Sequence, residues 1–145
     1  MYKSDKIIIF FIFIGFGVLF YYFPLQFNDT FYSNVITFLS ISFGFVITSL
    51  SILYNSQYIK ELYNSEDDED KNITALHRLG RYYRINIYFT ILLILYYIIS
   101  NVIITQYEYL KIIQIINIPL LICNCYITSV LIKLFIKLFT NPNYK

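Results

Sequence analysis

The side chains of this chain that could do chemistry in water gather in residues 55–86, the only long polar stretch of its 145 residues. This stretch holds five of the eleven basic residues, six of the nine acids and the only histidine, His77. Five of its acids are consecutive: Glu66, Asp67, Asp68, Glu69 and Asp70. Such a run cannot pack in a core, so a solvated loop tip is its simplest interpretation. Docking of a basic protein partner and metal binding are the alternatives, although the glycine and final glutamate of a calcium-binding loop are missing.

Three arginines, Arg78, Arg81 and Arg84, follow the acidic run. The apolar residues of 73–87 recur at helical spacing, which predicts an amphipathic helix with the arginines around its other faces. At the headgroup level of a membrane, arginine finds lipid phosphate, so we expect these three side chains to contact lipid. Direct binding of nucleic acid is disfavoured because lipid is the nearer partner. His77 is interpreted as a surface histidine.

Groups for catalysis are missing from the apolar parts of the sequence. No acid, lysine, arginine or histidine lies in the central part of any apolar stretch. Intramembrane charge usually marks proton relays and ion coupling, so a proton-coupled exporter of the small multidrug type is disfavoured. Nothing resembles a nucleophile with its base, a zinc motif or a phosphate loop, and we expect no enzyme, cofactor or metal. Cys123 and Cys125 would point apart on a helix, which favours buried thiols over a disulfide.

The elements that position these residues are four apolar stretches in a sequence with 58% hydrophobic and 14% charged residues. About 20 apolar residues in a helix cross a hydrocarbon core of about 30 Å. We therefore predict an all-α integral membrane protein, a single membrane domain of residues 1–145 with four transmembrane helices. The predicted segments are transmembrane helices at 7–25, 35–54, 87–104 and 112–132, a helical hairpin within the loop 55–86, and an amphipathic tail at 133–145.

The basic residues are distributed unevenly between the two sides of such a membrane domain. Two precede residue 7, five lie in residues 55–86 and three follow residue 132, whereas the two short turns carry only Lys111. By the positive-inside rule, both termini and the loop 55–86 face the cytoplasm.

Two of the apolar stretches carry polar stripes. Ser40, Gly44 and Thr48 are spaced four apart in the second, with Asn34, Thr37, Ser51 and Asn55 extending the same face. Small residues on one face let another helix approach closely, so helix packing is favoured over a water-filled path. The fourth stretch carries a second stripe, which contains Gln114, Asn117, Asn124 and Thr128. Carboxamides in hydrocarbon need partners, so this stripe faces either the interior of a bundle or another subunit, or else it lines a pore.

In its layout, the chain resembles the small four-helix membrane proteins of bacterial antiphage defence systems, of the Kiwa membrane subunit type. The likeness is carried by residues 42–55, SFGFVITSLSILYN, which run into the polar loop, and by residues 81–86, RYYRIN, which return from it. The resemblance implies a homo-oligomer in the bacterial inner membrane that senses infection or membrane disturbance and works with a cytoplasmic protein docked on the loop.

The expected function is therefore that of a homo-oligomeric membrane sensor or platform, with membrane lipid, other copies of the chain and a cytoplasmic protein as partners. An oligomeric channel or membrane-permeabilising pore lined by the second polar stripe is the alternative. A third possibility is an immunity-type protein whose helices only anchor the acidic loop.

Overall fold

The computed structural model shows five α-helices: α1 (Lys3–Tyr22), α2 (Asp29–Tyr54), α3 (Tyr58–Asn64), α4 (Ala75–Gln106) and α5 (Lys111–Thr140). It describes residues 3–23, 25, 27–56, 58–66, 71, 73–106 and 111–140, without the side chains of residues 58, 61, 104–106, 111, 112, 114 and 138–140. Within these residues, β-type pairing is confined to one isolated antiparallel bridge between Glu66 and Thr74. The prediction of an all-helical protein is confirmed.

Four of the helices contain segments long and apolar enough to cross a membrane: Lys3–Tyr22, Asp29–Tyr54, Ala75–Ile103 and Ile115–Lys137. The shortest of these, with 20 residues, reaches about 30 Å at 1.5 Å per residue, which matches a hydrocarbon core. Large apolar side chains cover the outside of the helices; Phe11, for example, is 66% exposed and Leu92 63%. Such a surface is stable in lipid and unstable in water. The fold is that of a multi-pass membrane protein.

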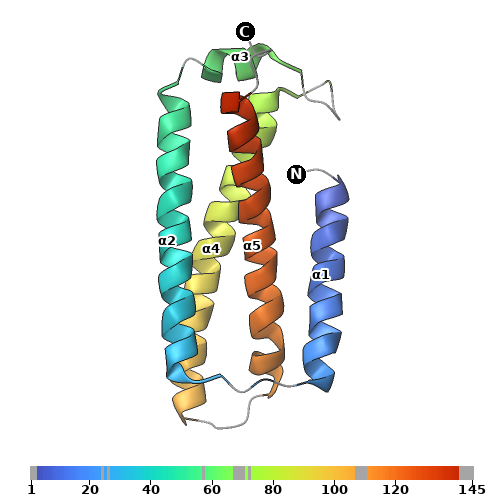
Figure 1. Cartoon of the computed structure of the whole chain (residues 1–145), viewed down its shortest axis with the longest axis vertical. Helices are drawn as coiled ribbons and strands as arrows, with labels where there is room; N and C mark the ends of the chain where they lie inside the picture. The colour runs from blue at the N-terminus through green and yellow to red at the C-terminus, as the bar shows by residue number, and fades with distance from the viewer. Residues whose placement is uncertain are drawn as a thin grey trace.

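The helices form a three-helix core with a fourth helix on its side (Figure 1). Helix α4 contacts both α2 and α5, while α1 packs on α5. The short helix α3 lies across one end, and the first residues of α1 and the last residues of α5 point toward that same end (Figure 1). The last residues of α1 and the first residues of α2 lie at the opposite end, as do the last residues of α4 and the first residues of α5 (Figure 1).

The helix ends follow local chemistry. Helix α2 begins at Asp29, six residues before the span predicted from residue 35, because the side chain of Asn28 accepts a hydrogen bond of 2.9 Å from the backbone N–H of Phe31. This is a standard helix N-cap. Helix α4 begins at Ala75, two residues into the predicted amphipathic segment 73–87, and runs without a break through the rest of it and through the third predicted span. Helix α5 retains Pro119 in its interior and continues beyond residue 132 to Thr140.

Two apolar clusters lie at different levels of the three-helix core. The one nearer α3 joins α2, α3, α4 and α5, and it is built from Val46, Leu53, Leu62, Leu79, Tyr82, Tyr83 and Leu131. The other joins α2 and α4 and contains Tyr32, Val35, Leu39, Leu93 and Tyr97. Along α4, the residues between the two clusters include the buried polar side chains Asn86 and Thr90. The core is thus apolar at two levels and polar between them.

Candidate functional site

A chain of four buried polar side chains joins α4 to α5 between the two apolar clusters. The Nδ2 group of Asn124 donates to Thr90 Oγ1 at 2.8 Å, and Asn86 Nδ2 donates to Thr128 Oγ1 at 2.8 Å. The hydroxyl of Thr90 also lies 3.5 Å from Asn86 Oδ1. Asn86, Thr90 and Asn124 are fully buried, and Thr128 is 9% exposed. In hydrocarbon, no water can replace a partner that these donors lose. Each bond therefore holds the two helices in one register.

A second polar centre, around Asn117, connects all three core helices. Asn117 Nδ2 donates to the hydroxyl of Tyr32 on α2 at 2.7 Å, and Tyr96 on α4 donates to Asn117 Oδ1 at 3.0 Å. The hydroxyl of Tyr97 donates to the backbone carbonyl of Asn117 at 2.5 Å. Nearer α3, the hydroxyls of Ser49 on α2 and Tyr83 on α4 are 3.1 Å apart. Hydrogen-bonded polar side chains therefore hold the core helices together at three levels.

One carboxyl group links α1 to the core helices by hydrogen bonds. Within α1, all of which the structure describes, Asp5 is the only buried residue, at 8% exposure. Its carboxyl group accepts hydrogen bonds from the hydroxyl of Tyr82 on α4 and, at 3.1 Å, from that of Tyr126 on α5. One turn further along α1, the Cys123 thiol lies 3.8 Å from the carbonyl oxygen of Ile9. Apart from a half-buried apolar face against α5, α1 turns large apolar side chains outward, so Asp5 is its main polar attachment.

The structure buries most of the stripe predicted on the fourth span. Asn117, Asn124 and Thr128 lie within the chain's own bundle and bond there, while the side chain of Gln114 is outside the described part. The sequence allowed three environments for this stripe: the interior of a bundle, a contact with another subunit, or the wall of a pore. The observed contacts are those of a bundle interior.

The stripe of α2 has the opposite position. Ser40, Gly44 and Thr48 are exposed, as are Asn34, Thr37, Ser51 and Asn55. The hydroxyls of Ser40 and Thr48 donate to the backbone carbonyls of Ile36 and Gly44 at 2.8 and 2.9 Å. A Cβ built on Gly44 would meet nothing within 4 Å. Among the described residues, no other helix of this chain packs against the stripe.

The charged residues singled out from the sequence are separated by the fold. Arg81 and Arg84 are exposed, whereas Arg78 is only 7% exposed. Arg81 lies one turn from His77, with 3.3 Å between the guanidinium and the ring Nε2. Glu66 is exposed beside the bridge to Thr74, and Asp67 to Asp70 lie outside the described residues.

The groups that bind metals are dispersed as well. Among the described side chains, no three of histidine, cysteine, aspartate and glutamate come together as a metal site. Cys123 and Cys125 are free thiols, the first buried and the second partly buried.

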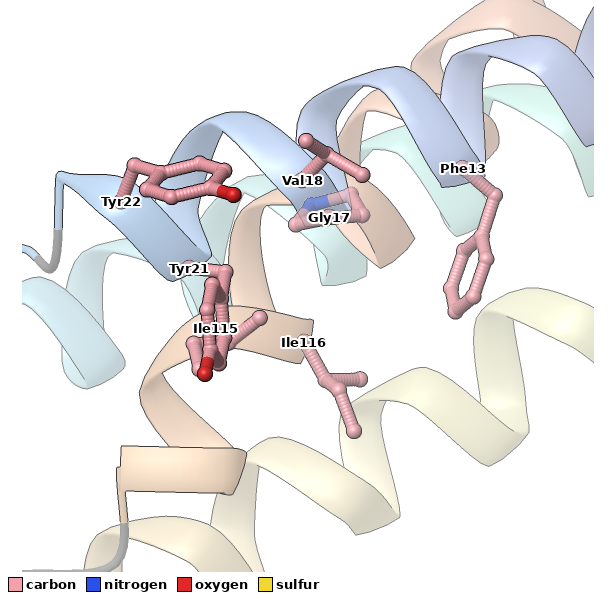
Figure 2. Close-up of a pocket in the computed structure, with 8 residues that line it drawn as sticks. Phe13, Gly17, Val18, Tyr21, Tyr22, Ile115 and Ile116 are labelled. Atoms are coloured by element: carbon pink, nitrogen blue, oxygen red, sulfur yellow. The ribbon is translucent and has the colours of Figure 1, made fainter.

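An open apolar groove of about 390 Å³ separates α1 from the first half of α5. Figure 2 shows Phe13, Val18 and the two tyrosines Tyr21 and Tyr22 on the α1 side, with Ile115 and Ile116 facing them from α5. The lining is almost entirely hydrocarbon, apart from the tyrosine hydroxyls near the end of the span. It suits a lipid chain and offers no pair of groups for acid–base chemistry.

The fold and its polar interior define a membrane protein whose four apolar helices are held together by hydrogen bonds. Comparison of the chain with protein-family models, with curated proteins and with solved structures found no match.

The sequence pattern did not reveal Asp5 as a structural group. It precedes the first apolar run and sits between Lys3 and Lys6, so it looks like part of a solvated head. Its two phenol partners lie 77 and 121 residues away in the chain. Spacing within one helix cannot predict such a contact. The signal that was present is a carboxyl group at the start of a helix that otherwise has only apolar residues facing its neighbours.

Replacing Asp5 with alanine is expected to loosen α1. The change removes the acceptor of two phenol hydroxyls, which costs about 1–3 kcal/mol of unfolding free energy. Unfolding of the purified protein in mixed micelles with increasing dodecyl sulfate measures this loss. Lys6→Ala, at an exposed position of the same helix, is the matched control. In a Cys125→Ser background, maleimide should also label Cys123 faster in Asp5→Ala; labelling and stability equal to the control would contradict the attachment.

Replacing Asn117 with leucine keeps the size of the side chain but removes its bonds to Tyr32 and Tyr96. We expect a loss of about 1–3 kcal/mol, since the buried tyrosine hydroxyls lose their partner. The same unfolding measurement applies, with Asn64→Leu on the exposed face of α3 as control. If Asn117→Leu were as stable as the unmodified protein, the centre around Asn117 would not hold the core.

Proposed function

We propose that this protein is a homo-oligomeric membrane platform that presents its α2–α4 connection to a cytoplasmic partner. The observation that carries the proposal is the outward position of the α2 stripe. The described side chains of the α5 stripe are instead buried and hydrogen-bonded within the same chain. A small-residue face that its own chain leaves uncovered is available to another copy.

The chemistry of the stripe suits helix association in lipid. Lipid tails are as apolar as leucine, so membrane helices associate through close packing and hydrogen bonds rather than through the hydrophobic effect. Gly44 has open space around it, and Ser40 and Thr48 already satisfy their hydroxyls on their own backbone. A second helix can therefore approach the stripe closely, and the approach leaves no polar group unpaired.

The distribution of charge indicates which side of the membrane each end of the bundle faces. The start of α1, the end of α5 and helix α3 point toward the same end of the bundle (Figure 1). Among the described residues, the stretches at that end carry nine basic residues, and the positive-inside rule assigns such an end to the cytoplasm. The run Glu66 to Asp70 would then meet cytoplasmic proteins, and its charge would attract a basic surface at a distance of about one Debye length, near 8 Å at physiological salt.

The resemblance in layout to membrane subunits of antiphage defence systems suggests the setting for such a platform. The proposed role is in the inner membrane of a bacterium, where infection or membrane disturbance changes the platform and the change reaches the docked protein. The exposed arginines Arg81 and Arg84 would hold the cytoplasmic end of α4 at the lipid headgroups.

The pore reading is weaker because Asn117 and Asn124 are fully buried and bonded within one chain. A path lined by these residues would require the three core helices to separate and leave the tyrosine and threonine partners unpaired.

Replacing Gly44 with leucine is expected to weaken self-association. The added side chain fills the space that lets a second helix approach, and losing contacts of about 1–2 kcal/mol lowers association about tenfold. Co-purification of two differently tagged copies, expressed together and mixed in membranes before extraction, measures the effect. Gly15→Leu is the matched control, since a Cβ at Gly15 also meets nothing within 4 Å. Equal co-purification in the two variants would show that copies do not meet through the stripe.

Neutralising the acidic run, by changing Glu66 and Glu69 to glutamine and Asp67, Asp68 and Asp70 to asparagine, is expected to release the cytoplasmic partner. Soluble protein that co-purifies from the native host should be lost in this variant and in high salt, while self-association persists. The control neutralises Asp29, the first residue of α2, together with Glu108, which follows α4 in the sequence. A partner that stays bound to the neutralised loop, or that is lost equally in the control, would contradict docking on the acidic run.

A further inference from the structure

We propose that the α2 stripe of one copy packs into the groove between α2 and α5 of the next copy, so that the copies associate head to tail. This inference rests on the proposed self-association and specifies the two surfaces that meet. The stripe is Ser40, Gly44 and Thr48.

The receiving groove lies on a different face of the same molecule. It has a volume of about 480 Å³ and lies between Phe38, Ile41 and Phe45 of α2 and Asn124, Cys125 and Ser129 of α5. In Figure 1, α2 and α5 lie on either side of α4, and α1 covers only the far side of α5. Helix α1 therefore does not fill the groove between α2 and α5.

One atom in this region lacks the hydrogen bond that its environment demands. Asn124 lines the groove and is fully buried, and its Nδ2 is used by Thr90. Its Oδ1 has no hydrogen-bond partner among the described residues. An unpaired carbonyl in hydrocarbon is unfavourable, so an occupant of the groove gains by bringing a donor. Lipid acyl chains carry none.

The stripe brings donors at the right depth. Copies in one membrane share the direction of the membrane normal, so equivalent residues lie at equal depth. The groove includes α2 residues 38–45, and the stripe spans residues 40–48 of the same helix. The hydroxyl of Ser40 therefore lies level with the groove of a neighbouring copy.

Moving that hydroxyl to a new acceptor leaves nothing unpaired. Ser40 Oγ now donates to the carbonyl of Ile36, which as an interior helix carbonyl also accepts the backbone N–H one turn on. Asn124 Oδ1 is covered in the single chain, so the side chains that line the groove must move aside as Ser40 of the next copy enters. When Ser40 then turns toward this oxygen, the backbone bond at Ile36 remains and the unpaired oxygen gains a donor. The small side chains at 40, 44 and 48 let the two backbones come close enough for this contact.

The symmetry of the contact follows from the angle between the two surfaces. At 3.6 residues per turn, the stripe and the groove-facing residues of α2 lie about 110° apart around the helix. A contact between two different surfaces is heterologous, and it closes into a ring when the rotation allows. A ring of three or more copies is thus expected, rather than a two-fold dimer with stripe against stripe.

Native Cys125 in the groove allows a direct test in membranes. Ser40→Cys is introduced with Cys123→Ser, so that each copy carries one thiol on the stripe and one in the groove, and copper phenanthroline oxidises the pair. We expect covalent species beyond the dimer, since each copy can join two neighbours. Adding Cys125→Ser should abolish the ladder. Leu92→Cys, on the exposed face of α4, replaces Ser40→Cys as the control and should give no ladder.

The other outcomes separate the two proposals. Dimers that persist with Cys125→Ser would show stripe against stripe, which overturns the head-to-tail contact and leaves the homo-oligomeric platform standing. The same holds if the copies co-purify but Ser40→Cys cross-links no better than Leu92→Cys, because another surface then mediates association. Absence of both cross-links and co-purification would overturn the inference together with the proposed function.

Discussion

The rest of this structure depends on the requirement that polar groups placed in hydrocarbon find partners within the protein. Membrane helices gain little from burying apolar surface against each other, so the hydrogen bonds of Asn124 with Thr90 and of Asn86 with Thr128 decide which faces of α4 and α5 meet. Each such bond is worth only about 0.6–1.7 kcal/mol. Their arrangement at several levels makes them specific, because a rotation of either helix would unpair several groups at once.

The same requirement explains the uneven attachment of the helices. The core helices share polar pairs at three levels, whereas α1 is joined through Asp5 at one end and otherwise through apolar contacts with α5. An apolar helix loses little when it exchanges a protein neighbour for lipid. Helix α1 is therefore the element of the fold most easily displaced, and α2, with its outward small residues, is the element best suited to meet another copy.

Hydropathy was enough to predict the all-helical membrane fold, because runs such as residues 7–25 have one stable form in lipid. The helix ends were less predictable, since the Asn28 cap and the continuity of α4 and α5 beyond the apolar runs depend on backbone hydrogen bonds rather than on hydropathy. Periodicity placed Asn117, Asn124 and Thr128 on one face, but it could not say whether that face meets helices or water. The partners, Tyr32, Tyr96 and Thr90, lie on other helices, where only the three-dimensional arrangement brings them near.

The mass of the unmodified complex, extracted directly into lipid nanodiscs or polymer-bounded native membrane and corrected for lipid, is the most informative measurement. Outward small residues on α2 and an unpaired Asn124 oxygen predict a homo-oligomer whose protein mass is three or more times that of the 17.4 kDa chain. A monomer under these conditions would mean that lipid alone covers the α2 stripe, and the protein would then be an anchor rather than a self-associating platform.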